Sequence, residues 1–221
     1  MSIAQNIGDV NARMGAKTRL IAVTKTKPID ILLEAYHANF KRFGENKVQE
    51  MAEKHQALPK DIEWHLIGHL QSNKVKYIAE FVSMIHSVDS LKLLREIDKY
   101  AAKHNRVIDC LLQIAISDEE TKFGMSQQEA EALMDDPALL ELNHVCIKGL
   151  MGMASNTTDE AQIRTEFRGL KSFFEHISAT KKASPVLQMQ EISMGMSGDY
   201  PIAVEEGSTL VRVGSAIFGS R

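Results

Sequence analysis

The regular alternation between short apolar runs and longer segments of helical periodicity constrains the fold of this chain most. The apolar runs are rich in β-branched residues and are predicted to be strands, at residues 19–25, 41–45, 62–68, 84–88, 107–115, 146–153, 186–192 and 209–213. Helices are predicted between them at 29–39, 46–57, 72–81, 90–104, 126–134, 159–179 and 200–206, with a short one after Gly214. Strands that alternate with helices pair in parallel through right-handed crossovers.

Eight strand–helix units without a Pro-, Gly- or Ser-rich linker favour a closed α/β barrel, the (β/α)8 TIM barrel, over a doubly wound sheet. A chain of 221 residues is a common length for one such domain, so residues 1–221 are expected to form a single barrel domain. Apolar residues recur at helical spacing within residues 1–17 and predict an N-terminal amphipathic helix. Ser72 and the pair Asp89-Ser90 are predicted N-caps.

Composition argues against several classes of partner. The 26 basic and 29 acidic residues give a net charge of −3, which gives no reason to expect nucleic acid or a membrane surface as a partner. No apolar span approaches the length of a membrane helix, and the N-terminus lacks the features of a secretory signal. Cys110 and Cys146 lie in apolar runs and are predicted to be reduced core thiols. A soluble, cytoplasmic protein is therefore expected.

Two loops rich in Gly and Ser follow the last two predicted strands. They read "SMGMSGD" (193–199) and "RVGSAIFG" (212–219). Small residues let backbone N–H groups approach an anion, and barrels of this kind frequently hold a phosphate in the loops after strands seven and eight. Either loop alone is most simply a turn, but the two together predict a phosphate site.

The stretch "LIAVTKTKP" ends the first predicted strand in a lysine. In a closed barrel, strand eight neighbours strand one, so this lysine is expected beside the phosphate site. A lysine amine next to a phosphate predicts an aldehyde cofactor that carries a phosphate and is held as a Schiff base, pyridoxal 5′-phosphate. Lys25 shares the face of Ile21 and Val23, whereas Lys27 lies past the strand, so Lys25 is the predicted nucleophile.

Arg212 lies in the middle of the last predicted strand, "TLVRVG", where a charge is costly unless it is paired or used. One interpretation is a structural ion pair. The other is an arginine directed at the pyridine nitrogen of the cofactor, which would keep that nitrogen unprotonated and weaken the ring as an electron sink.

Six stretches resemble the pyridoxal-phosphate homeostasis proteins (the YggS/PROSC family), which are single-domain relatives of the alanine racemase barrel. They are "AVTKTKP", "FGENKVQE", "WHLIGHLQSNK", "KGLMGMA", "SMGMSGD" and "VRVGSAIFG", and the resemblance runs from about Arg19 to Arg221. Leu66 stands where the family usually has Phe or Met. The family is thought to bind and buffer the cofactor without a demonstrated catalytic turnover.

The resemblance also implies roles for individual residues. Lys25 would form the Schiff base, Asn46 would lie near the cofactor, and Arg212 would face the pyridine nitrogen. The residues implied for the phosphate-binding loops are Ser193, Ser197, Gly214 and Ser215.

Two other motifs resemble functional sites, a zinc pair and a nucleophile elbow, but neither is predicted to be one. His65 and His69 are four residues apart, a spacing that could hold zinc on a helix, but the segment is a predicted strand and no nearby carboxylate completes a ligand set. No metal is therefore predicted. "GMSGD" around Ser197 is one residue away from a nucleophile elbow, which belongs to a different α/β fold.

The alternatives for function are a carrier and an enzyme. A racemase of this barrel type needs two bases on opposite faces of the cofactor, and its second base comes from a separate domain for which a single barrel of 221 residues leaves no room. A monomeric cofactor-binding homeostasis protein is therefore predicted, with apo-enzymes that use pyridoxal phosphate as candidate partners. A weak racemase or lyase dependent on the same cofactor is the alternative. A phosphosugar aldolase is a third and distant one.

Overall fold

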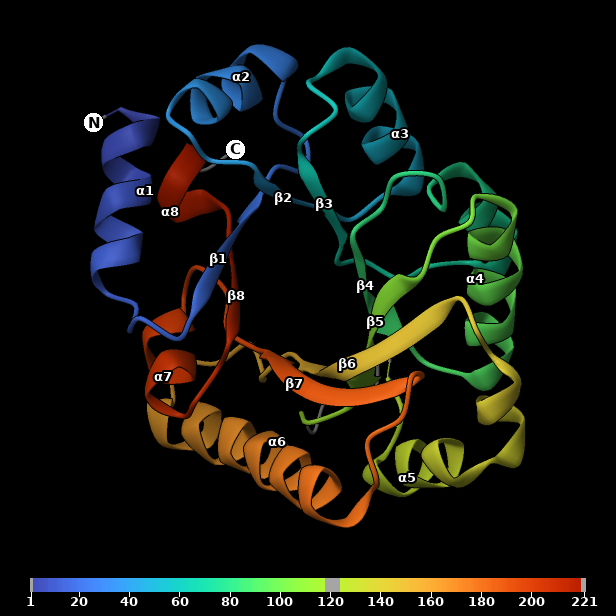
Figure 1. Cartoon of the computed structure of the whole chain (residues 1–221). Coiled ribbons are helices and arrows are strands. Elements are labelled where there is room, and N and C mark those ends of the chain that lie inside the picture. The colour runs from blue at the N-terminus through green and yellow to red at the C-terminus, as the bar shows by residue number, and fades with distance from the viewer. Residues whose placement is uncertain (1, 118–123, 220–221) are drawn as a thin grey trace.

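Eight parallel strands close into a barrel in the computed structural model, which describes residues 2–117 and 124–219 (Figure 1). The strands are β1 (Arg19–Val23), β2 (Arg42–Glu45), β3 (Glu63–Leu66), β4 (Met84–Val88), β5 (Ile108–Ile114), β6 (Val145–Gly152), β7 (Leu187–Ser193) and β8 (Leu210–Val213). The barrel closes where β1 pairs with β8, with Ile21 opposite Arg212. The predicted (β/α)8 barrel is confirmed.

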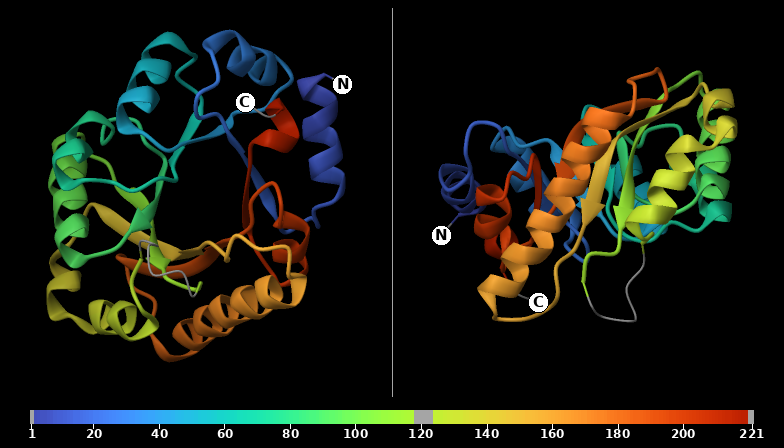
Figure 2. Two further views of the ribbon diagram at one scale, coloured as in Figure 1. Left: turned by 180° about the vertical axis from the view of Figure 1, so that it is seen from behind. Right: turned by 90° about the horizontal axis from the view of Figure 1, so that it is seen from below.

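Helices surround the barrel on all sides, as both views in Figure 2 show. They are α1 (Ile3–Ala12), α2 (Ile29–His37), α3 (Val48–Ala57), α4 (Leu91–Lys103), α5 (Gln127–Asp135), α6 (Glu160–Thr180), α7 (Tyr200–Glu205) and α8 (Ser215–Phe218). The predicted N-terminal helix is α1, which lies beside α8, and Asn6 Nδ2 donates to the Ile217 carbonyl at 2.7 Å. No helix within the described residues is both long and apolar enough to cross a bilayer.

The predicted helix at 72–81 is wrong in type and length. The segment forms a 3₁₀ helix, η1 (Ser72–Tyr77), and its N-cap is Gln71 instead of Ser72. Val75 and Ile78, three residues apart, are both fully buried, and a 3₁₀ helix puts side chains three apart on one side. The second predicted cap is correct in part, since Ser90 accepts a hydrogen bond from the Leu93 amide. A second 3₁₀ helix, η2 (Pro137–Glu141), was not predicted.

The core has two layers. The larger one lies between the strands and the helices and includes Trp64 and Phe43, both fully buried. A smaller cluster lies on the inner face of the barrel and consists of Ile21, Met84, Leu111, Met151 and Leu210. Cys110 and Cys146 are buried free thiols, as predicted. The acidic loop that begins at Ser117 falls largely outside the described residues.

Candidate functional site

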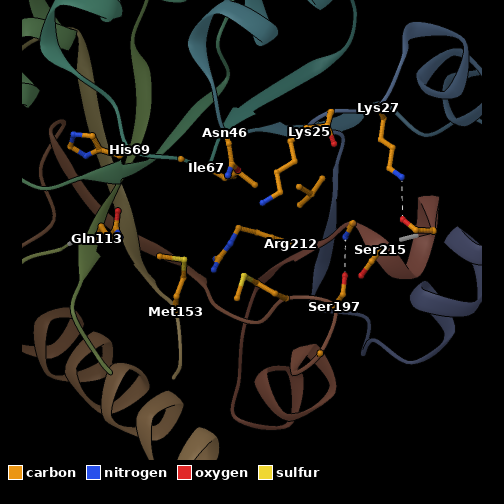
Figure 3. Close-up of a pocket in the computed structure, with 17 residues that line it drawn as sticks. Lys25, Lys27, Asn46, Ile67, His69, Gln113, Met153, Ser197, Arg212 and Ser215 are labelled. Atoms are coloured by element: carbon orange, nitrogen blue, oxygen red, sulfur yellow. Dashed lines mark hydrogen bonds between the residues drawn. The ribbon is translucent and has the colours of Figure 1, made fainter. Parts of the chain in front are cut away.

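A cavity of about 510 Å³ opens at the carboxyl ends of the strands. It is lined by Val23 at the end of β1, Asn46 after β2, Ile67 after β3, and the loops after β7 and β8 (Figure 3). This is the end of the barrel at which such folds bind ligands. Of the seven predicted site residues, six line this cavity: Lys25, Asn46, Ser197, Arg212, Gly214 and Ser215.

The two lysines that follow β1 have different surroundings. The half-buried side chain of Lys25 points into the cavity, and within the described residues its amine has no hydrogen-bond partner (Figure 3). Lys27 Nζ instead donates to the carbonyls of Phe218 and Gly219, each at 3.1 Å. The strand ends at Val23 rather than at Lys25, so Lys25 lies in the turn after it. Val23 and Lys25 nevertheless both line the cavity.

The Gly/Ser loops after β7 and β8 meet at one side of the cavity. Ser197 Oγ accepts a hydrogen bond from the Gly214 amide at 3.1 Å, and this bond ties the two loops together. A Cβ at Gly214 would lie 3.2 Å from the Val23 carbonyl oxygen, so a glycine lets the loop approach β1 closely. Ser197, Gly198, Gly214 and Ser215 thus form one polar wall.

Arg212 reaches the cavity from inside the barrel. Its side chain is buried; Nη1 donates to Ser193 Oγ at 2.6 Å and Nη2 to the Gly152 carbonyl at 3.1 Å. In the part of the chain that the structure describes, no carboxylate lies within ion-pair distance of it, so the structural ion pair considered above is not found there. Burial lowers the pKa of Arg212 to about 10, which leaves the guanidinium charged at neutral pH.

Ser193 is not brought to the cavity. It is the last residue of β7, and its fully buried side chain points into the barrel, where it contacts Arg212 and His86. The side chain does not line the wall made by the two Gly/Ser loops, because the chain leaves the strand only after this residue. A direct contact between Ser193 and a phosphate therefore stays a prediction that the geometry of the cavity does not favour.

The family model described as alanine racemase, N-terminal domain, matches residues 1–221. The pyridoxal phosphate homeostasis protein of Haemophilus influenzae is 39% identical over 206 residues, which are 92% of this chain and 85% of that protein. The corresponding protein of Aquifex aeolicus is 38% identical over 92% of this chain and 87% of its own length. This chain belongs to the pyridoxal phosphate homeostasis protein family.

Solved structures agree with this homeostasis family. PipY of Synechococcus elongatus PCC7942, solved with pyridoxal phosphate bound, is 36% identical, with a TM-score of 0.87 over 99% of this chain and 100% of that one. The same protein without the cofactor has a TM-score of 0.90. Alanine racemase of Clostridium difficile, at 13% identity and a TM-score of 0.75, shares the fold over 100% of this chain but only 56% of its own.

In this family member, the turn that carries Lys25 is held by a group of charged residues that sequence reasoning missed. Lys54 Nζ donates at 2.7 Å to the Thr24 carbonyl, to Glu45 and to Glu50. Glu50 Oε1 in turn accepts from the Thr26 amide at 2.5 Å. We call Glu45, Glu50 and Lys54 the turn clamp. The spacing of four residues between Glu50 and Lys54 on α3 was the signal available in the sequence.

Burial raises the pKa of Glu45 in this clamp, against the opposing effects of Lys54 and Thr24. Its Oε1 accepts from both of these residues, whereas Oε2 is buried and has no hydrogen-bond partner among the residues that the structure describes. The Glu45 carboxyl is therefore held through Oε1, by Thr24, which precedes Lys25, and by Lys54, which also binds the Thr24 carbonyl.

His65 and His69, which were considered as a zinc pair, do not face each other. His65 is buried inside the barrel, whereas His69 lines the cavity, with its Nδ1 3.7 Å from Asp89 Oδ2. The chain passes from β3 into the loop between them, which separates the two rings. Within the described residues, no group of three His, Cys, Asp or Glu side chains could hold a metal ion.

Proposed function

We propose that this chain binds pyridoxal 5′-phosphate in the cavity, that Lys25 holds it as a Schiff base, and that the chain serves in cofactor homeostasis by holding and handing over the aldehyde. The observation that carries the proposal is the Lys25 amine, which points into the cavity and has no hydrogen-bond partner within the described residues. An amine that is already positioned and not committed to an acceptor is what reversible imine formation with an aldehyde requires.

The other cavity residues fit the remaining parts of this cofactor. The wall of Ser197, Gly198, Gly214 and Ser215 offers hydroxyl and amide donors of the kind that bind a phosphate. Arg212 can only donate hydrogen bonds, so a pyridine nitrogen that meets it must accept and stay unprotonated. When bound, the cofactor supplies an aldehyde and an aromatic ring that stabilises negative charge. A ring whose nitrogen is unprotonated does so weakly, which suits storage more than turnover.

The relatives support the same proposal. PipY, at 36% identity, has been solved with pyridoxal phosphate bound, and the curated relatives are described as homeostasis proteins. We further propose that the chain acts as a cytoplasmic monomer and that apo-enzymes dependent on this cofactor receive it. A phosphosugar aldolase, the most distant alternative, would be colourless as purified, whereas a protein that holds pyridoxal phosphate as an imine would be yellow.

Replacement of single lysines tests the proposal. The wild-type chain incubated with pyridoxal phosphate and then freed of unbound cofactor should stay yellow, and borohydride followed by peptide mapping should locate the adduct on Lys25. Lys25→Ala should abolish the visible band. Lys27→Ala is the matched control and should keep the visible band, because the Lys27 amine is already bound to the carbonyls of Phe218, the last residue of α8, and of Gly219. An adduct on Lys27 alone would overturn the assignment.

A weak racemase or lyase is the second candidate, and one observation favours it. His69 lines the same cavity as Lys25, so an imidazole that could exchange a proton lies within the site. Loss of the α-hydrogen of added amino acids to deuterated water, in the presence of pyridoxal phosphate, separates the two functions. A carrier should show exchange no faster than free cofactor, and a racemase should show exchange that falls in His69→Asn.

A further inference from the structure

A chain of four hydrogen bonds crosses the inside of the barrel from the cavity to its opposite end. Arg212 Nη1 lies 2.6 Å from Ser193 Oγ, and Ser193 Oγ lies 3.0 Å from His86 Nδ1. His86 Nε2 lies 2.9 Å from His65 Nδ1, and His65 Nε2 lies 3.0 Å from Glu63 Oε1. Glu63 is the first residue of β3, at the amino end of the strands. The chain therefore links the cavity to a carboxylate at the far mouth.

The direction of the chain follows from its arginine end. A guanidinium only donates, so Ser193 Oγ accepts from Arg212. The hydroxyl proton of Ser193 then needs an acceptor, because the side chain is fully buried, and His86 Nδ1 is the acceptor within reach in the described structure. His86 Nδ1 is therefore unprotonated, and the proton of the neutral ring lies on Nε2, directed at His65.

The same direction follows independently from the carboxylate end. An ionised Glu63 only accepts, so His65 Nε2 carries a proton and donates to it. The hydrogen bond from His65 and the charge of Arg42 lower the pKa of Glu63 and keep it ionised. A neutral His65 then has an unprotonated Nδ1, which accepts from His86 Nε2. The deductions from the two ends meet at the bond between the histidines and agree there.

An extra proton on either ring would break this arrangement. On His65 it would place two N–H donors against each other between the rings, and on His86 it would place an N–H donor against the O–H of Ser193. Burial lowers the pKa of both histidines. The positive charges of Arg42 and Arg19 lower the pKa of His65 further. The positive charge of Arg212 does the same for His86. Glu63 acts in the opposite direction and raises the pKa of His65.

We propose that Glu63, His65, His86 and Ser193 form a one-way relay that stabilises the charge of Arg212 and fixes the orientation of its guanidinium in the cavity. The relay acts in addition to the charge of Asp199, which also stabilises the charged guanidinium. In each hydrogen bond of the relay, the donor lies on the side of Arg212 and its proton points away from Arg212. The negative end of each O–H or N–H dipole in the relay therefore faces the guanidinium. The last acceptor of the relay is a carboxylate, that of Glu63. Hydrogen bonds in such a series strengthen one another. The four residues are positioning residues and do not contact the cavity ligand.

The structural part of the relay can be tested without any cofactor. ¹⁵N spectra of histidine-labelled, full-length protein should show both His65 and His86 as neutral rings protonated on Nε2 at neutral pH. A ring protonated on Nδ1, or a charged ring, at either position would overturn the relay.

The effect on the cavity rests on the proposed function and is tested with pyridoxal phosphate as the probe. Glu63→Gln keeps an acceptor oxygen but removes the charge. It should shift the nitrogen resonances of His86, which does not contact residue 63, and should weaken cofactor binding about fivefold, the lower range of coupling between sites. Glu191→Gln is the matched control: Glu191 pairs with Arg19 and Thr209 and contacts neither histidine.

The outcomes separate the two proposals. Unmoved His86 resonances and unchanged affinity in Glu63→Gln would overturn transmission through the relay, as would an equal effect of Glu191→Gln. A wild-type chain that fails to bind pyridoxal phosphate would overturn the proposed function, while the histidine spectra of the cofactor-free protein would still decide the relay.

Discussion

The amines of Lys25 and Lys27 differ in what they already bind. Lys27 would have to give up two carbonyl contacts before it could react with an aldehyde, whereas Lys25 would lose none within the described residues. A hydrogen bond from a charged group contributes about 1.5–3 kcal/mol, so this difference favours Lys25 as the reacting amine. Two lysines that look alike in sequence are thus expected to differ in reactivity, because within the described residues only Lys27 of the two is bound to carbonyls at the end of α8.

Ser215 and Ser197 should discriminate between the phosphorylated and unphosphorylated forms of the ligand. Replacing either by Ala should weaken binding of pyridoxal phosphate about 10- to 100-fold, because a charge-assisted hydrogen bond is lost. Binding of pyridoxal should change far less. Titration of each variant with both ligands, followed by absorbance, checks this. Ser215→Ala is the cleaner variant, because Ser197 also holds the Gly214 amide.

Ser178→Ala is the control for this pair. Its hydroxyl bonds the Phe174 carbonyl on the outside of the barrel, far along the chain from both loops. Equal weakening of pyridoxal and pyridoxal phosphate by Ser215→Ala would count against a phosphate contact.

At the scale of elements, the connection from β1 to α2 stores backbone strain beside Lys25. Thr26 has a φ of +62°, a conformation that is a genuine outlier for a β-branched residue. The turn clamp holds the Thr26 amide through Glu50 and the Thr24 carbonyl through Lys54. Such strain, about 1–3 kcal/mol, persists where the surroundings over-determine the backbone, and it gathers at functional sites.

Thr26→Gly should therefore raise the stability of the fold but weaken binding of the cofactor at the site. Relief of the strain, less the greater entropy loss of glycine, should raise the free energy of unfolding by about 1 kcal/mol. Binding of pyridoxal phosphate should weaken, because the position of Lys25 becomes less restricted. Urea unfolding and a cofactor titration measure the two effects.

Asn39→Gly provides the comparison, since Asn39 has the same φ of +62° but a side chain that tolerates it. Equal gains in stability at both positions would show that Thr26 is not specially strained.

The elements differ in how well sequence predicts them. Most of the eight strands were predictable because they are apolar runs between turn residues, and β2, with the sequence RFGE, fits the alternation of strands and helices more than it fits an apolar run. Errors in the strands are confined to their ends, as at Lys25. Segment 72–81 was misassigned because period three and period 3.6 look alike over so few residues. The relay could not be predicted, since it joins residues from elements far apart in the chain. For the turn clamp, the spacing of Glu50 and Lys54 could be seen in the sequence, but not that Lys54 reaches the turn after β1. His86 lies in "MIHSV" among apolar neighbours, and nothing local shows that it meets Ser193.

For the whole molecule, Glu63 should make stability depend on pH in acid. Its folded pKa is about 2, below the ordinary value of 4.5, first through the hydrogen bond from His65. The stability that it contributes is therefore fully present above about 4.5 and is lost as the pH falls through about 2. The free energy of unfolding of Glu63→Gln should fall less steeply over this range than that of the wild type.

Urea unfolding at the two ends of the range measures this difference. Glu191→Gln again serves as the control, because it removes one carboxylate charge but leaves His65 its acceptor. Parallel pH profiles for the wild type and Glu63→Gln would contradict the prediction.

Closure of the barrel has a consequence for how other proteins can approach it. Since β1 pairs with β8, each of the eight strands has a neighbour on both sides, and the sheet has no free edge to which a foreign strand could add. A partner protein therefore cannot bind by adding a strand to this sheet, and aggregation by strand addition is prevented in the same way. An apo-enzyme that takes the cofactor by contact would have to meet the rim of loops around Lys25 and Ser215 face to face.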